Sequence, residues 1–197
     1  MTSQDEPLAL LDRALAQTDT ILAGIRPDQA ALPTPCRDWD VRALTRHVVG
    51  QDLPNFTTAA QGGTPDWQAP AEEVGEDWIG AYRAGAQRLL DVWRAAKLDQ
   101  PVSMPGGREA PLGSRIDQQL AELSVHGWDL AKATGQDVAL DPAVAARALE
   151  WASKMLRPEF RGAGKSFGDE VPVDPQAPIS DRLVGWFGRD PGWTPPS

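Results

Sequence analysis

The amino-acid sequence predicts an all-α protein, built as a four-helix bundle with one or two additional helices toward the C-terminus. Four long segments carry apolar residues at the three- and four-residue spacing of an amphipathic helix. Stretches rich in proline and glycine separate these segments, as expected for the short connections of a bundle. Residues 102–104 are the one place where a short strand is expected.

The first two helices are expected over residues 4–24 and from residue 40 to about residue 60. In the first, leucine and isoleucine recur at helical spacing, with charged residues between them. The second begins after Asp40, a residue type that caps helix N-termini by accepting backbone hydrogen bonds. The pair Gly62-Gly63 should end this second helix, because glycine is favoured just past a helix C-terminus.

Three further long segments complete the helical pattern. The third helix is expected over residues 72–96, and the fourth over residues 114–134, with Ser114 as a cap and a glycine after its end. The fifth is expected over residues 142–156, because Asp141 followed by proline is a typical helix start.

The domain organisation follows from the distribution of proline and glycine. Residues 1–157 should form the helical bundle that carries the metal-binding groups. Residues 158–197 are rich in proline and glycine and should form a short extension packed on the bundle, with one short helix at residues 178–187. A total of 197 residues suits one domain of this kind.

Charge and composition exclude several classes of function. The net charge of −9, without a cluster of basic residues, argues against a nucleic-acid partner. No apolar run is long enough to span a bilayer, and the N-terminus lacks the features of a signal peptide. The single cysteine, Cys36, excludes an intramolecular disulfide and fits a reducing compartment. We therefore expect a cytoplasmic protein without a membrane partner, either a monomer or a homodimer.

The candidate functional residues are the only two histidines and a nearby carboxylate. His47 and His126 each lie in a predicted helix, and Glu122 precedes His126 by four residues, which places both side chains on one helical face. Two imidazoles and one carboxylate are typical ligands of an open catalytic zinc site. Spacing alone leaves a second interpretation open, in which Glu122 and His126 form an ordinary surface pair. Asp129, one turn further on, either acts at the site, as a partner behind a ligand or in contact with the substrate, or is a helix-surface charge.

Other candidate groups are weaker. Cys36 precedes Arg37, a cation that could lower the thiol pKa, but an unreactive loop thiol is the expected state because no second cysteine exists. Residues 162–166 lack the full pattern of a phosphate-binding loop. Gln51 and Trp128 are secondary candidates for lining a ligand pocket.

Three segments resemble a known family. The segment Thr34-Pro-Cys-Arg-Asp-Trp-Asp-Val-Arg-Ala-Leu-Thr-Arg-His47-Val-Val-Gly50 resembles the opening signature of the DinB/YfiT-like metalloenzyme superfamily, most closely the branch that contains mycothiol-dependent maleylpyruvate isomerase. The segment from Glu122 to Gly135 is similar to the second signature of that branch. Residues 177–191 resemble the C-terminal segment of a short actinobacterial subgroup of metal-binding proteins.

The resemblance implies a DinB-type four-helix bundle that binds a divalent metal, zinc or nickel, through His47, Glu122 and His126. It also implies mycothiol as a cosubstrate, in thiol transfer to a small electrophile or in thiol-assisted cis–trans isomerisation. The isomerase carries a further mixed domain after its bundle, where this chain has about forty residues, so substrate-binding groups of that domain are not carried over. A non-catalytic metal-binding or ligand-binding helical module is the alternative.

Overall fold

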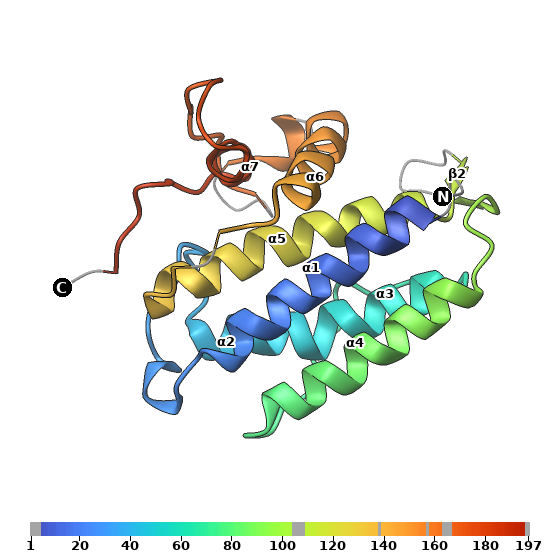
Figure 1. The fold of residues 1–197 in the computed structure, drawn as a ribbon, viewed down its shortest axis with the longest axis horizontal. Helices are drawn as coiled ribbons and strands as arrows, with labels where there is room; N and C mark the ends of the chain where they lie inside the picture. The colour runs from blue at the N-terminus through green and yellow to red at the C-terminus, as the bar shows by residue number, and fades with distance from the viewer. Residues whose placement is uncertain (1–4, 104–108, 138, 157, 163–166, 196–197) are drawn as a thin grey trace.

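Four long helical segments lie side by side in the computed structural model (Figure 1), as predicted for an all-α bundle. The structure describes residues 5–103, 109–137, 139–156, 158–162 and 167–195; most of the segment 162–166 therefore lies outside the described residues. The bundle segments are α1 (Asp5–Ala23), a continuous run of α2 (Val41–His47), a π-helical turn (Val48–Asp52) and α3 (Leu53–Ala60), then α4 (Trp78–Ala95) and α5 (Ser114–Thr134).

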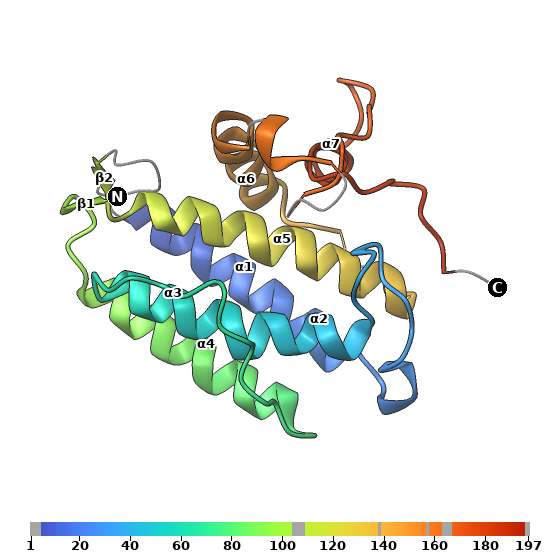
Figure 2. The same ribbon diagram turned by 180° about the vertical axis from the view of Figure 1, so that it is seen from behind.

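Two further helices lie on the outer side of α5 (Figure 2). Helix α6 packs against α5, and α7 packs against α6 and α5. The strand predicted at residues 102–104 is present as β1 and pairs with a second strand. Met104, expected at its end, lies outside the described residues. The remaining elements are α6 (Pro142–Met155), α7 (Ile179–Trp186), the antiparallel strands β1 (Pro101–Ser103) and β2 (Glu109–Pro111), and two 3₁₀ turns (Pro27–Gln29, Pro158–Phe160).

The predicted helix starts can be checked against the hydrogen bonds that the structure forms. The carboxylate of Asp40 accepts a hydrogen bond from the backbone N–H of Ala43 at 2.8 Å, and Asp141 caps α6 in the same way, with proline at the first turn. These two caps are confirmed. The predicted cap at Ser114 is wrong, because this residue is the first of α5 and its hydroxyl donates back to the carbonyl of Pro111.

The third helix starts six residues later than the sequence pattern suggested. Residues 72–77 were expected to be helical, but α4 begins at Trp78, after Asp77, whose carboxylate caps it. The backbone N–H of Glu72 instead donates to the carbonyl of Gly50 at 2.9 Å. The loop of residues 61–77 is thus held against the π turn, and tertiary hydrogen bonding outweighs the local helical pattern.

Helix α5 is buried on nearly all sides, because α1 and α2 cover it from the bundle and α6 covers it from outside. Apolar side chains at helical spacing are buried here: Leu112 just before the helix, and Ile116, Leu123 and Leu130 within it. Charged residues of α5 therefore lie in the interior, where each needs a partner. Within the part of the chain that the structure describes, no helix has the length and apolarity needed to cross a membrane.

Candidate metal centre

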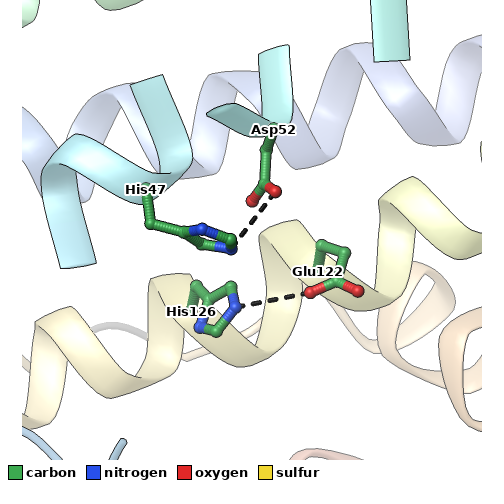
Figure 3. Close-up of side chains that lie close together, drawn as sticks. All are labelled: His47, Asp52, Glu122 and His126. Atoms are coloured by element: carbon green, nitrogen blue, oxygen red, sulfur yellow. Dashed lines mark ion pairs between the residues drawn. The ribbon is translucent and has the colours of Figure 1, made fainter. Parts of the chain in front are cut away.

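Four side chains that can bind a metal meet between the π turn and α5 (Figure 3). His47 and Asp52 come from the end of α2 and the π turn, and Glu122 and His126 come from α5. One ligand atom from each residue lies within 4.8 Å of all the others. The structure thus brings together the three residues singled out in the sequence, and it adds Asp52, which the sequence reasoning missed.

The two imidazoles face each other with their Nε2 atoms directed at the carboxylates. His47 Nε2 lies 3.2 Å from Asp52 Oδ1, and His126 Nε2 lies 3.3 Å from Glu122 Oε2. The ring centroids are 5.1 Å apart, and the ring planes are nearly perpendicular, at 84°. Two nitrogen and two oxygen donors therefore converge on one point.

The π turn explains why Asp52 reaches this point. In a regular α-helix, a residue five positions after His47 lies about 140° away around the axis. A π turn adds one residue to the hydrogen-bonded ring, which brings residues five apart onto the same face. The run from Val48 to Asp52 is such a turn. A helical wheel of uniform pitch thus places Asp52 on the wrong face.

A glutamine orients the ring of His47. Gln51 Oε1 lies 2.7 Å from His47 Nδ1, and Gln51 Nε2 donates to the carbonyls of Ala69 at 2.6 Å and Trp67 at 3.3 Å. Because the amide nitrogen is engaged by two carbonyls, the amide oxygen must be the atom that faces the ring. His47 Nδ1 therefore donates, and Nε2 presents a lone pair to the centre. The indole of Trp39 covers the ring at a centroid distance of 4.4 Å.

A buried ion pair stands behind His126. Asp129 Oδ2 lies 3.4 Å from His126 Nδ1 and 2.9 Å from Arg189 Nη2, and Arg189 Nε lies 3.3 Å from Asp129 Oδ1. The Asp129 side chain is completely buried. Of the two roles left open for Asp129, a helix-surface charge is therefore wrong. It is an interior carboxylate that contacts the second nitrogen of His126, a common arrangement around metal-binding histidines.

The end of α7 positions Arg189. The backbone N–H of Arg189 donates to the carbonyl of Val184 at 2.9 Å, and Gly188 donates to Gly185, also at 2.9 Å. Gly188 has a φ of 81°, so these bonds form a Schellman motif that requires a left-handed residue. The turn directs the guanidinium at Asp129. Arg189 is a second functional residue that the sequence reasoning did not single out.

Without a metal, the pKa values of the two histidines move in opposite directions. Burial and the nearby His126 lower the pKa of His47 to about 4. Burial also disfavours charge on His126, but hydrogen bonds to Asp129 and Glu122 outweigh it and raise the His126 pKa to about 9. Burial raises the pKa of Asp52 well above its usual value. His126 therefore holds a proton at neutral pH, the raised pKa of Asp52 favours a second proton at the centre, and a metal ion would have to displace these protons.

The charges of the buried groups match a divalent cation. Asp52, Glu122 and Asp129 are three carboxylates, and Arg189 is the one cation that faces them in the described part of the chain. With both imidazoles neutral, two negative charges remain without a partner. A divalent ion would balance them, and a set of two nitrogens and two oxygens suits zinc or nickel. The residues present therefore fit a divalent metal.

A cavity of about 550 Å³ lies beside His47. Its wall includes His47 and Gln51, the indoles of Trp39 and Trp78, and the side chain of Arg42. Of the four clustered side chains, His47 is the one that lines this cavity. Gln51, one of the two secondary pocket candidates, lines it; Trp128 is buried in α5 and is not among its lining residues.

The lone cysteine is held in its thiol form. Burial raises the pKa of Cys36 to about 11, and Arg189 lowers it only in part. Arg37, the neighbour considered above, is exposed. The Cys36 sulfur lies within 4.8 Å of ligand atoms of His126 and Asp129, on a smaller cluster beside the main one. An unreactive thiol at neutral pH follows.

Comparison with known proteins identifies the family. The family described as mycothiol maleylpyruvate isomerase N-terminal domain matches residues 11–131. Two uncharacterized proteins of Mycobacterium tuberculosis, Rv0738 and MT0763, are each 35% identical over 189 residues, which cover 93% of this chain and 98% of theirs.

The fold is also shared with solved structures. The crystal structure of the mycothiol-dependent maleylpyruvate isomerase superposes with a TM-score of 0.60 at 18% identity, covering 78% of this chain and 72% of that one. A histidine-to-alanine mutant of that enzyme gives a TM-score of 0.59 at 17% identity, with coverages of 85% and 75%. These results confirm the resemblance found in the sequence: the chain belongs to the mycothiol maleylpyruvate isomerase N-terminal domain family.

Proposed function

We propose that this protein binds one divalent metal ion, zinc or nickel, through His47, Glu122 and His126. We further propose that it uses a small thiol of the mycothiol type, as a transferase or isomerase acting on a small electrophile. One observation carries the metal site: two imidazole nitrogens and the facing carboxylate oxygens converge within 4.8 Å in a buried position. Membership of a family named for a mycothiol-dependent isomerase supports the thiol and the reaction class.

The contact between His47 Nε2 and the carboxyl of Asp52 supports a bound cation at the centre. His47 Nε2 has no proton when Nδ1 donates to Gln51, yet it lies 3.2 Å from a carboxylate oxygen of Asp52. Either a proton on Asp52, whose pKa is raised by burial, or a positive charge between the two atoms makes this contact favourable. A bound divalent ion would supply that charge, and it would favour the thiolate form of a thiol at neutral pH.

The protein's own residues supply orientation and access. Gln51 and Asp129 fix the two imidazole rings from behind, so that each Nε2 atom faces the centre. The cavity beside His47, whose lining includes Trp39 and Trp78, gives a small molecule a place next to one of the proposed ligands. Arg42, on the same wall, offers a cation to a negatively charged group of a thiol or an electrophile.

Metal content is the first test. Elemental mass spectrometry of tag-free protein should find about one equivalent of zinc or nickel per chain. The His47→Ala, His126→Ala double variant should contain none. A parent protein that takes up no metal even after reconstitution, beside an equally stable double variant, overturns the proposal.

Thiol binding is the second test. Adding a small thiol to cobalt-loaded protein should produce a new near-ultraviolet band from a cobalt–thiolate bond. The same addition to the double variant serves as the control.

One observation favours a second candidate, a non-catalytic metal-binding module. Asp52 places a fourth protein donor at the centre, and four protein ligands are typical of closed, structural zinc sites. Such a protein would bind metal tightly, and the cobalt spectrum would not change when thiol is added. The thiol titration therefore separates the two candidates.

A further inference from the structure

We propose that Asp52 is a direct ligand, so that two histidines and two carboxylates hold the metal. This inference rests on the metal binding proposed above and not on the thiol chemistry, since four protein ligands leave a thiol only a fifth coordination position or the place of a displaced ligand. It adds a ligand that comes from the π turn and not from the helical pattern. The site then has a hard donor set without sulfur, and its two carboxylates balance the charge of a divalent ion.

The distances between donor atoms fit this arrangement. Zinc bonds of about 2.0–2.1 Å in a tetrahedron place neighbouring donor atoms about 3.3 Å apart. The observed separations are 3.2 Å between His47 Nε2 and Asp52 Oδ1, and 3.3 Å between His126 Nε2 and Glu122 Oε2. Each pair thus has the length of one edge of such a site. One ligand atom from each of the four residues stays within 4.8 Å of the others, so the two pairs can belong to one centre.

The carboxyl of Asp52 is buried and has one polar contact among the described residues. The residue is 3% exposed, and the structure records His47 Nε2 as its contact among the described polar groups. That nitrogen carries no proton while Nδ1 donates to Gln51. The ionised form of this carboxyl is costly in the interior, which is why burial raises the pKa of Asp52. Coordination to a metal would remove this cost.

The backbone provides an independent argument. π turns are rare and occur frequently at functional sites, because they change which side chains share a helical face. Here Pro54 has no N–H to donate to the carbonyl of Gly50, four residues earlier, and this carbonyl accepts the N–H of Glu72 from outside the helix. As a result, the side chain of Asp52 faces His47. A regular helix over the same residues would direct the carboxylate elsewhere.

The test compares metal binding by the parent, Asp52→Asn and two control variants. Zinc affinity, measured by chelator competition, should fall by more than about 100-fold in Asp52→Asn, which exceeds the effect usual for a residue behind a ligand. Gln51→Ala, which removes the partner behind His47, should lose about 10- to 100-fold. Asp19→Asn makes the same chemical change in a surface ion pair with Arg83 and should leave zinc affinity unchanged.

The cobalt spectrum distinguishes a ligand from a neighbour of a ligand. Loss of a coordinating oxygen changes the visible bands of bound cobalt(II), so Asp52→Asn should show altered bands. Gln51→Ala should keep the parent spectrum at saturating cobalt. Asp52→Ala should behave as Asp52→Asn does, which provides a second variant if the first folds poorly.

Stability without metal gives a third measurement. Because Asp52→Asn removes a carboxyl that is costly to ionise in the interior, its metal-free form should unfold at a higher denaturant concentration than the metal-free parent at pH values where Asp52 is ionised. Its stabilisation by added zinc should be smaller. Parent-like zinc affinity and cobalt bands in Asp52→Asn would overturn the inference and leave the three-residue site standing, whereas a parent that binds no metal overturns both.

Discussion

The two sides of the candidate metal centre are built differently. On α5, Glu122 and His126 stand four residues apart on a regular helix. On the other side, His47 and Asp52 stand five residues apart across a π turn. Each side presents one imidazole nitrogen and one carboxylate oxygen at nearly the same separation. A regular helix and a π turn thus place the same two donor types.

The groups behind the two histidines also differ. Asp129 and Arg189, a buried ion pair, stand behind His126, and the C-terminal segment supplies the arginine. Gln51, a neutral amide bound to carbonyls of the 61–77 loop, stands behind His47. The α5 side therefore depends on a charge from the C-terminal segment, and the π side depends on a loop. Each side can be perturbed separately.

Arg189→Met should have the largest effect. It leaves Asp129 as a buried charge without its cation, which we expect to cost about 3–5 kcal/mol of unfolding free energy. The freed carboxylate would also hold the ring of His126 less well, so zinc affinity should fall by about 10- to 100-fold. Urea unfolding of the metal-free protein and zinc competition measure the two effects.

The double variant Arg189→Met, Asp129→Leu is the control for this prediction. Removing both charges should recover much of the lost stability, because no unpaired ion remains. If Arg189→Met alone unfolds at the parent's urea concentration, the pair does not join the C-terminal segment to α5 in the way described.

The second prediction concerns pH and the metal-free protein. The His126 pKa is raised from 6.5 to about 9, so its contribution to stability is complete below about pH 6.5 and is lost as pH rises to about 9. The raised pKa of Asp52 acts in the same direction. We expect a loss of at most about 3 kcal/mol over this window. Zinc-loaded protein should not show this loss, because the metal replaces the proton.

Urea midpoints at pH 6.5 and pH 9, with chelator and with zinc, test this prediction. Because the chain has two histidines, NMR can follow each ring, with one expected to titrate near pH 4 and the other near pH 9. A metal-free midpoint that rises with pH would contradict the assignment of the proton to His126.

The α5 side could be predicted from sequence because it obeys a regular period. Glu122, His126 and Asp129 share a face on any helix of uniform pitch, and the structure has such a helix. The bundle and most helix ends follow from the same periodicity, together with caps such as Asp40 and Asp141. Sequence patterns predict these helices and caps because residues close together in the sequence determine them.

The other side could not be predicted in this way. Pro54 is a local signal of an interrupted helix, because it cannot donate to the carbonyl of Gly50, but it does not indicate that the chain continues through a π turn or that Glu72 supplies the missing donor. Without the turn, Asp52 is placed on the wrong face. Arg189 reaches Asp129 across 60 residues of sequence, through a turn whose signal, Gly188, marks the end of a helix but not its target. Contacts between residues far apart in the sequence therefore help to set the positions of both Asp52 and Arg189.

Gly50→Ala should disturb the π side and leave the α5 side intact. A Cβ at this position would lie 2.4 Å from the carbonyl oxygen of Glu72, a backbone atom that cannot simply rotate away. We expect a loss of about 1–3 kcal/mol, as is typical of overpacking. The 61–77 loop would shift, Gln51 would lose its carbonyl partners, and zinc affinity should fall.

The loop itself can be monitored in this variant. Hydrogen exchange at Glu72 should become faster, and exchange along α5 should stay at the parent rate. Gly75→Ala, in the same loop but with nothing within 4 Å of the added Cβ, is the comparison. Unchanged exchange at Glu72 in Gly50→Ala would show that the contact does not hold the turn.

Arg147→Met should have the smallest effect, although it breaks an ion pair of the same form as Arg189 with Asp129. Arg147 contacts Asp117 on α5 through two bonds, Nε to Oδ1 at 2.8 Å and Nη2 to Oδ2 at 3.1 Å. Its side chain is 41% exposed, whereas that of Arg189 is 10% exposed. Water therefore compensates the charge that is left behind, and we expect a loss of at most about 1 kcal/mol and no change in zinc affinity. If urea unfolding instead shows equal losses for Arg147→Met and Arg189→Met, burial is not what distinguishes the pair behind His126, and the dependence of the α5 side on the C-terminal segment would need another cause.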